Sequence, residues 1–239
     1  MKEAVADRES PVAATAANTR SRHWLVVFFG STVGKKVVMA LTGAVGVGFI
    51  LLHVSLNLLV YAGPATINGA DKFLKSTGGW LWLARAILLG AVVLHIVTAY
   101  QLSRMSLGSR PVKYQQWEPV GSTFASRTMR WSGVLLALFI PLHVLHLATG
   151  ALHPHFVPEN VYRNVVSGFR VWYISVLYIF AMCLLALHLY HGAWSMFQSL
   201  GFNHPRYAGW IRPVATTFTI VVVLGFISIP VAVLLGAIS

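Results

Sequence analysis

The sequence predicts an all-α membrane protein, a bundle of five transmembrane helices. Of its 239 residues, 56% are hydrophobic and only 10% are charged, which leaves too little polar surface for a water-soluble domain. Five apolar segments reach the length of about 20 residues that crosses a bilayer. All six acidic residues fall outside these segments.

The five spans follow one another along the chain. They are too long for barrel strands, and a backbone in lipid must satisfy its own hydrogen bonds, so each is predicted to be a helix. Their approximate bounds are Val37–Tyr61, Trp80–Leu102, Trp131–Leu152, Val171–Phe197 and Pro213–Ile238.

The chain before the first span has a different composition. Residues 1–23 are polar, lack the apolar core of a signal peptide, and are expected to be disordered for most of their length. The apolar stretch 23–29 is too short to span, and we expect a short helix at the membrane interface ahead of Lys35 and Lys36. The predicted organisation is a tail with an interfacial segment, residues 1–33, and a five-helix domain, residues 34–239.

The distribution of basic residues predicts the orientation. Thirteen of the 18 Lys and Arg residues fall in the N-terminal tail, the second loop and the fourth loop, and five fall on the other side. Because basic residues collect in cytoplasmic loops, we expect the N-terminus in the cytoplasm and the C-terminus outside. The same asymmetry explains the net charge of +12, so nucleic acid is not an expected partner.

Four spans each contain a histidine, and the four lie at two depths. At 1.5 Å per residue, His53 and His143 lie roughly 25 and 20 Å from the inner face, whereas His95 and His188 lie roughly 14 and 15 Å from it. A polar ring at bilayer depth marks a function, and neutral imidazole is the commonest protein ligand for a metal. The sequence predicts two bis-histidine haems, an inner one on His95 and His188 and an outer one on His53 and His143, and hence electron transfer across a membrane.

Two further histidines leave the ligands of two spans open. His146 follows His143 by three residues and His191 follows His188 by three, so each shares a helix face with its neighbour. Either member of each pair could be the ligand. We favour His143 and His188, with His146 and His191 hydrogen-bonding a haem propionate or a quinone.

Arginines at the ends of the spans are predicted partners of the propionates. A guanidinium offers a carboxylate a bidentate match. Arg85 lies at the outer end of the second span and suits the outer haem, whereas Arg127 and Arg130 lie at the inner face and suit the inner one. The alternative for each arginine is a topology charge or a contact with a lipid phosphate.

Other function classes are not expected. The spans contain no carboxylate, which disfavours an ion-coupled transporter or a proton relay through a buried carboxylate. Neither a phosphate-binding loop nor an H-E-x-x-H motif is present in the sequence. The single cysteine, Cys183, cannot by itself hold an iron–sulfur cluster.

Four segments carry a family resemblance: GKKVVMALTGAVGVGFILLHVSLN, ASRTMRWSGVLLALFIPLHVLHLATG, LHLYHGAWSMFQSLGFNHPRY and GFISIPVAVLLG. They resemble the cytochrome b membrane-anchor subunit of succinate dehydrogenase and fumarate reductase, of the five-span, single-chain, two-haem kind. The resemblance covers roughly Gly34 to the C-terminus. In that family the first four spans each give one haem ligand, which implies the same four residues, His53, His95, His143 and His188.

The resemblance further implies a complex at the bacterial inner membrane, with a flavoprotein subunit and an iron–sulfur subunit on the cytoplasmic side. Electrons from succinate would pass through the iron–sulfur clusters, the inner haem b and the outer haem b to a quinone, usually menaquinone. This chain would have no dehydrogenase site of its own. It would anchor the complex and hold the haems. Lys35, Lys36, Arg104 and Arg110 are expected to help dock the iron–sulfur subunit.

Two other interpretations stay open at this point. Another dihaem cytochrome, such as the anchor of a hydrogenase or formate dehydrogenase, would share the bis-histidine ligation but not the string S-R-T-M-R-W-S-G. A non-redox transporter or scaffold would use its histidines only for hydrogen bonds. A reduced-minus-oxidised spectrum separates this last class from the cytochromes.

Overall fold

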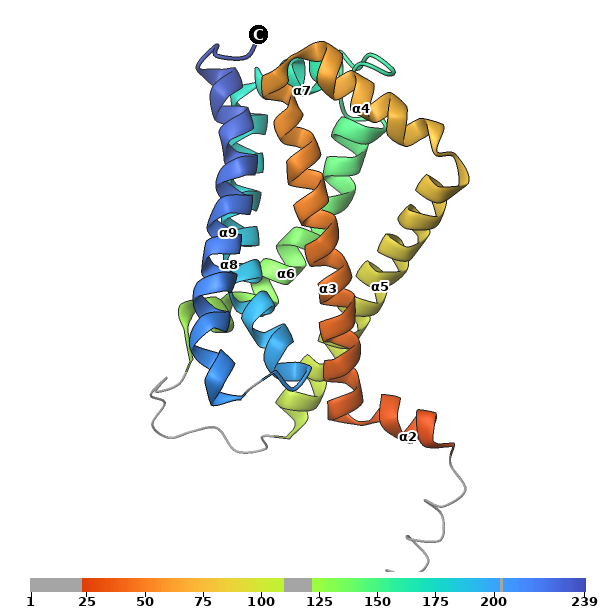
Figure 1. Ribbon diagram of the computed structural model, residues 1–239, viewed down its shortest axis with the longest axis vertical. Helices are drawn as coiled ribbons and strands as arrows, with labels where there is room; N and C mark the ends of the chain where they lie inside the picture. The colour runs from red at the N-terminus through yellow and green to blue at the C-terminus, as the bar shows by residue number, and fades with distance from the viewer. Residues whose placement is uncertain (1–22, 110–121, 203) are drawn as a thin grey trace, which may run out of the picture.

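The computed structural model describes residues 23–109, 122–202 and 204–239, and the regular elements in these ranges are all helices (Figure 1). Five of the helices are long and apolar enough to cross a membrane, which confirms the predicted five-helix fold class. They comprise α3 (Thr32–Asn57) continued by the 3₁₀ turn η1 (Leu58–Ala62), α5 (Gly79–Gly108), α6 (Phe124–His143) continued by the π turn η2 (Val144–Ala148), α8 (Trp172–Ser199), and α9 (Pro205–Leu234).

Among the described residues, three shorter helices lie at the two ends of the bundle. Helix α2 (Trp24–Gly30) precedes α3 at one end, which we call the α2 end (Figure 1). Helices α4 (Pro64–Ser76) and α7 (Val161–Phe169) lie at the other end, near the C-terminus. We call α4, α7 and the connecting residues 149–160 the cap. The sequence pattern of apolar spans did not predict the two cap helices, because neither is long or apolar enough to stand out.

Local capping explains where two of the spans begin. The Ser31 side chain accepts a hydrogen bond from the backbone N–H of Gly34 and starts α3. The Thr123 side chain accepts one from Ser126 and starts α6, seven residues before the expected Trp131. The predicted span begins later than α6 because the first turns of the helix are polar, and a span predicted from hydropathy contains only the apolar part.

The corner between α2 and α3 depends on a glycine. A Cβ atom on Gly34 would collide with the carbonyl oxygen of Phe28, so the close approach requires a residue without a side chain. Lys35 donates hydrogen bonds of 2.8 and 3.1 Å to the carbonyls of Phe29 and Gly30, which otherwise lack partners at the end of α2. The placement of α2 at the membrane interface stays a prediction, and the predicted disordered tail lies outside the described residues.

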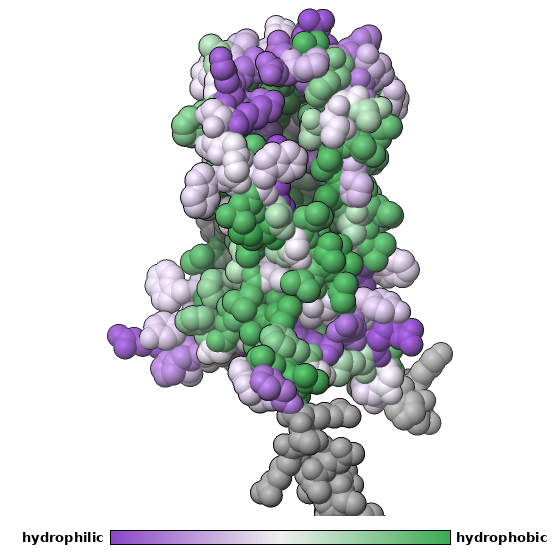
Figure 2. Space-filling model, turned by 90° about the vertical axis from the view of Figure 1, so that its right-hand side faces the viewer, coloured by the Kyte–Doolittle hydropathy of each residue, from purple (hydrophilic) through white to green (hydrophobic). Residues whose placement is uncertain are grey.

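The bundle is organised around α8 and α3. Helix α8 packs against α6, α9 and α3, and α3 packs also against α5. One core cluster lies between these helices around Val222, which is fully buried, and a second lies under the cap around Tyr178 and Phe169. The rest of the helix surface is largely apolar and exposed. Figure 2 shows this as a hydrophobic band between more polar ends, as expected for a surface that faces lipid.

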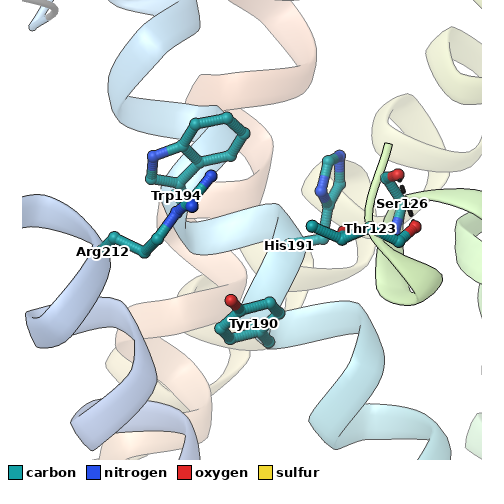
Figure 3. A pocket seen from close by; sticks show the side chains of 6 residues that line it. All are labelled: Thr123, Ser126, Tyr190, His191, Trp194 and Arg212. Atoms are coloured by element: carbon teal, nitrogen blue, oxygen red, sulfur yellow. Dashed lines mark hydrogen bonds between the residues drawn. The ribbon is translucent and has the colours of Figure 1, made fainter. Parts of the chain in front are cut away.

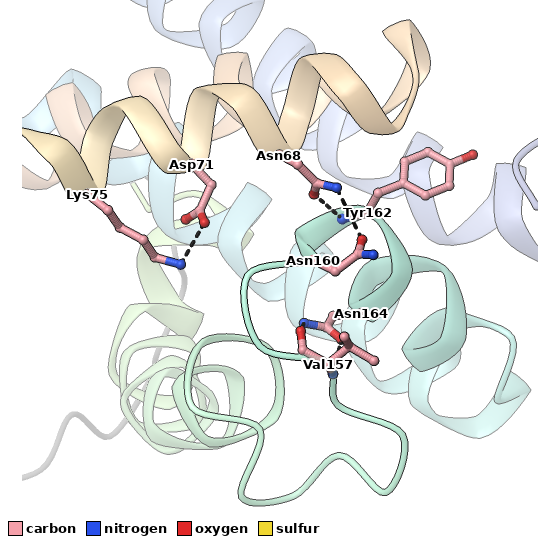
Figure 4. A network of polar contacts seen from close by, with 7 residues as sticks. All are labelled: Asn68, Asp71, Lys75, Val157, Asn160, Tyr162 and Asn164. Carbon is pink, nitrogen blue, oxygen red and sulfur yellow. Dashed lines mark hydrogen bonds and ion pairs between the residues drawn. The ribbon is translucent and has the colours of Figure 1, made fainter.

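Asparagine side chains tie the cap together (Figure 4). Asn68 on α4 donates to Asn160 and accepts from the backbone of Tyr162, at 3.2 and 3.1 Å. Asn164 on α7 exchanges two hydrogen bonds with the backbone of Val157, at 2.8 and 2.9 Å. The bonds to Val157 satisfy backbone groups of a loop, the bond from Tyr162 satisfies an N–H in the first turn of α7, and together they hold α7 against the end of the bundle.

Candidate functional site: two histidine pairs in the bundle

The four predicted ligands form two facing pairs inside the bundle. The ring centroids of His53 on α3 and His143 on α6 are 5.7 Å apart, and we call these residues the cap-end pair. The ring centroids of His95 on α5 and His188 on α8 are 6.3 Å apart, and we call these the α2-end pair. All four side chains are half-buried. The structure brings together the same residues that the depth argument pairs.

Each ring of the α2-end pair contacts a hydroxyl through its Nδ1 atom. Thr42 Oγ1 lies 3.1 Å from His95 Nδ1, and Ser132 Oγ lies 3.5 Å from His188 Nδ1. Both hydroxyls donate their single proton to a carbonyl of their own helix. Each hydroxyl therefore presents a lone pair to the ring, which favours the tautomer with a proton on Nδ1. The Nε2 lone pair of each histidine is then available to a metal.

A glycine follows each of these hydroxyl residues and lies against the same ring. A Cβ atom on Gly43 would be 3.5 Å from Cε1 of His95, and a Cβ atom on Gly133 would be 3.5 Å from Cε1 of His188. Helix α3 thus presents Thr42 and Gly43 to a histidine of α5, and α6 presents Ser132 and Gly133 to a histidine of α8. The two halves of the α2-end pair use the same arrangement.

The His53 ring of the cap-end pair is enclosed by aromatic side chains and one amide. Phe49 stacks on it with ring centroids 5.1 Å apart, and the Phe226 ring lies 5.7 Å away. The Asn57 Nδ2 atom lies 3.3 Å from His53 Nδ1 and donates a 2.7 Å bond to the His53 carbonyl. Aromatic packing therefore accompanies this polar contact of the ring.

The His143 ring is held in a different way. Its Nδ1 atom is buried and has no hydrogen-bond partner among the described residues. The rings of Phe139 and Tyr178 each lie 5.8 Å from it, centroid to centroid. Its orientation is set by aromatic packing rather than by a hydrogen bond.

His146 lies near His143, because both rings contact Tyr178, but it also has partners of its own. The helix changes to π geometry at Val144, three residues after Pro141, which lacks an N–H donor. A π turn has more residues per turn, so His146 is rotated from the position that an ideal α-helix would give it. Its Nδ1 atom lies 2.9 Å from the Tyr178 hydroxyl, and its ring stacks on His153 at 5.0 Å.

His191 lines a small pocket near the α2 end of α8 (Figure 3). The pocket lies between the start of α6, the end of α8 and the start of α9. Within it, the Arg212 guanidinium lies over the Trp194 ring, 4.8 Å from the centroid. The lining residues are Thr123, Ser126, Tyr190, His191, Trp194 and Arg212.

A comparison with family models identifies the class of membrane protein. The model for the succinate dehydrogenase/fumarate reductase transmembrane subunit matches residues 108–227. The chain belongs to this family. The match confirms the resemblance predicted from the sequence and makes the chain a membrane anchor of a succinate dehydrogenase or fumarate reductase complex. No curated protein and no solved structure matches the chain.

The family match covers only one half of each histidine pair. It includes α6, α7, α8 and most of α9, and so contains His143 and His188. His53 and His95 lie before it, on α3 and α5. For these two residues, the geometry of the bundle supports a role at the site.

Subunits of this cytochrome b-type family imply haem, and the donor set fits that group. A bond between a metal and an imidazole nitrogen is roughly 2 Å long. When the distance from the bound nitrogen to the centre of its ring is added on each side, the centroids of two rings that bind one metal lie about 6 Å apart. The two pairs measure 5.7 and 6.3 Å. In the α2-end pair, the hydroxyl contacts also leave both Nε2 atoms free to act as ligands.

The three arginines predicted to meet propionates lie at exposed positions. The Arg85 guanidinium lies over the Trp82 ring at 4.9 Å, and Arg127 donates to the Ser122 carbonyl at 3.3 Å. Arg130 is exposed as well. Among the described residues, the arginine that lines the pocket beside His191 is Arg212 rather than Arg127 or Arg130.

Sequence reasoning missed Thr42, Ser132, Tyr178 and Arg212. The sequence did contain a pattern that marks the two hydroxyl residues. Each is followed by a glycine and lies 11 residues before a histidine: Thr42 before His53, and Ser132 before His143. Eleven residues make about three helical turns, so the hydroxyl and the histidine share a helix face about 16 Å apart. Tyr178 and Arg212 gave no such signal, because their partners lie on other helices.

Proposed function

We propose that this chain is the membrane-anchor and electron-transfer subunit of a succinate:quinone oxidoreductase, which links a cytoplasmic iron–sulfur subunit to a quinone through two b-type haems. The observation that carries the proposal is the presence of two facing histidine pairs at two levels of one five-helix bundle. Haem, when bound, supplies reversible one-electron carriers; the polypeptide supplies ligands, orientation and burial.

Each histidine pair is assigned one haem. His95 and His188 would hold the haem nearer the α2 end, and Thr42 and Ser132 would accept hydrogen bonds from their Nδ1 protons. His53 and His143 are the proposed ligands nearer the cap. His146 is not assigned as a ligand, because its ring is engaged by Tyr178 and His153.

The pocket beside His191 is the proposed site for the carboxylate edge of the haem at the α2-end pair. His191 and Trp194 lie three and six residues beyond His188 on α8, or about 5 and 9 Å further toward the α2 end. A cationic Arg212, an imidazole and the Thr123 hydroxyl can donate hydrogen bonds to an anion there, whereas the Ser126 hydroxyl already donates to the Thr123 carbonyl. We add Arg212 to the earlier candidates Arg85, Arg127 and Arg130.

The α2 end is assigned to the cytoplasm of a bacterial inner membrane, following the distribution of basic residues. The iron–sulfur and flavoprotein subunits would then lie at this end, nearer to the α2-end pair. Lys36 and Arg104 are exposed there, whereas Lys35 caps α2 and Arg110 lies outside the described residues. Menaquinone is the proposed electron acceptor, and this proposal rests on the resemblance of the chain to two-haem membrane anchors.

The proposal is tested on the purified complex by a reduced-minus-oxidised spectrum and by the ratio of haem to protein. We expect b-type bands, two haems for each chain, and a co-purifying covalent flavin. A chain with haem and no flavoprotein would indicate the anchor of another oxidoreductase. Absence of haem from an intact complex that carries the flavoprotein would contradict the electron-transfer role.

A further inference from the structure

The cap-end pair contains one ring that no described hydrogen bond orients. His143 Nδ1 is buried without a partner, although histidine ligands of metals generally donate their second nitrogen to an acceptor that fixes the ring. A half-buried imidazole on a helix can rotate about its side-chain bonds unless neighbouring groups restrict it. The groups in contact with the ring therefore decide its orientation.

Tyr178 is the neighbour that connects this ring to the rest of the molecule. It is only 6% exposed, and its ring meets those of Phe139 and Phe169 edge to face, at 5.0 and 4.9 Å. Its hydroxyl is fixed by the 2.9 Å contact with His146 Nδ1. The Tyr178 ring thus has little freedom, and it presents a fixed surface to His143.

His146 is held from its other side by the cap. Its ring stacks on His153 with planes 14° apart, and His153 in turn donates from Nε2 to the Asn164 carbonyl at 3.0 Å. The backbone N–H of His155 donates to His153 Nδ1 at 3.2 Å, so both nitrogens of His153 are engaged. Helix α7 approaches so closely that a Cβ atom on Gly168 would lie 3.0 Å from His146 Cε1.

From these contacts we propose that Tyr178 is a positioning residue for His143, and that a column of Tyr178, His146 and His153 fixes the outer haem ligand to the cap. This inference rests on the proposed function, because it takes His143 as a haem ligand. The orientation and burial of its ligands are among the ways in which a protein tunes the potential of a haem. The column would therefore adjust the midpoint potential of the cap-end haem and leave that of the other haem unaffected.

The decisive variant is Tyr178→Phe, which keeps the ring and removes the hydroxyl that binds His146. The intact complex is compared with wild type by low-temperature EPR and by redox titration of both haems. We expect both haems to remain bound, the low-spin EPR signal and midpoint potential of one haem to shift, and those of the other to stay unchanged. The haem at the α2-end pair is an internal control in the same sample.

Two further variants separate positioning from a general loss of structure. Gly168→Ala moves His146 from the other side and should shift the same haem signal as Tyr178→Phe. Tyr173→Phe removes the hydroxyl of an exposed tyrosine on the same helix and should change neither signal.

Unchanged signals in Tyr178→Phe, or equal shifts of both haems, would overturn the inference. Loss of both haems would do the same, because the column would then act on folding rather than on one ligand. A wild-type complex without two distinct haem signals would instead contradict the proposed function itself.

Discussion

The two histidine pairs have the same kind of side chain but are oriented by different means. At the α2-end pair, each ring contacts a hydroxyl on a neighbouring helix, and a glycine lets that helix approach. At the cap-end pair, aromatic rings enclose both histidines, and His143 Nδ1 has no hydrogen bond among the described residues. One pair is oriented mainly by hydrogen bonds and the other mainly by packing.

The location of each pair in the bundle explains the difference. The α2-end pair lies in a part of the bundle that consists of long helices alone, where small residues at helix contacts permit close approach. The cap-end pair lies under α4 and α7, where a buried cluster around Val165, Phe169 and Tyr178 supplies large side chains. A histidine near the end of a span can thus be positioned by groups outside the span, whereas one in the middle of a span depends on neighbouring helices.

The largest effect is expected from removing the ligands. His95→Ala and His53→Ala should each halve the ratio of haem to protein, because each removes one axial ligand from a different pair. His191→Ala should keep both haems, since His191 is proposed to meet the carboxylate edge of a haem in its pocket and not to bind the iron. Haem content against protein concentration measures the ratio, and an unchanged ratio in His95→Ala would exclude that residue as a ligand.

The second prediction concerns the hydroxyls of the α2-end pair. Thr42→Val and Ser132→Ala should each weaken haem retention at this pair by about 10- to 100-fold, the usual effect of removing a partner of a metal ligand. Thr42→Val should have the larger effect, because its contact is shorter, 3.1 Å against 3.5 Å. Retention is followed by titrating apo-protein with haem.

Ser55→Ala is the matched control for these hydroxyl variants. Its hydroxyl also donates to a carbonyl of α3 but is exposed and contacts no histidine. If the cap-end haem were lost as readily as the other in Thr42→Val, the contrast between the two pairs would not hold.

A smaller effect is expected from Arg212→Gln. The loss of a positive charge beside the proposed carboxylate site should lower the midpoint potential of one haem only, because a cation favours the reduced form. A charge-assisted hydrogen bond of this kind contributes about 1.5–3 kcal/mol. Arg85→Gln, at the opposite end of the bundle, should leave that haem unchanged. If the midpoint potential shifted in Arg127→Gln or Arg130→Gln but not in Arg212→Gln, the arginines expected from the sequence would be the better candidates for the partner of the haem carboxylate.

The smallest effect on both pairs is expected from charge reversal at the α2 end. Lys36→Glu combined with Arg104→Glu should release the soluble subunits at a lower salt concentration and leave both haems bound, because exposed charges mainly steer association. Lys35 is left out because it caps α2, so its loss would mix a folding effect with docking. Gel filtration at increasing salt measures the release; equal salt resistance would exclude docking through these charges.

The sequence alone determined the membrane fold class and the pairing of the four histidines. Both follow from quantities that can be counted along the sequence. Apolar length predicts a span, and the fixed rise of a helix converts residue number into depth. The comparison with the family then confirmed the class of subunit, although its match begins after His53 and His95.

Only the tertiary structure decided which neighbours each ring meets. His146 lies in the π turn after His143, with Tyr178 on one side and His153 on the other, and spacing along an ideal helix cannot predict these partners. In the same way, Arg212 joins His191 because α9 returns beside α8. Depth depends on one helix at a time, whereas the direction of a side chain and its partners depend on how several helices pack, and this is the part that the sequence left undetermined.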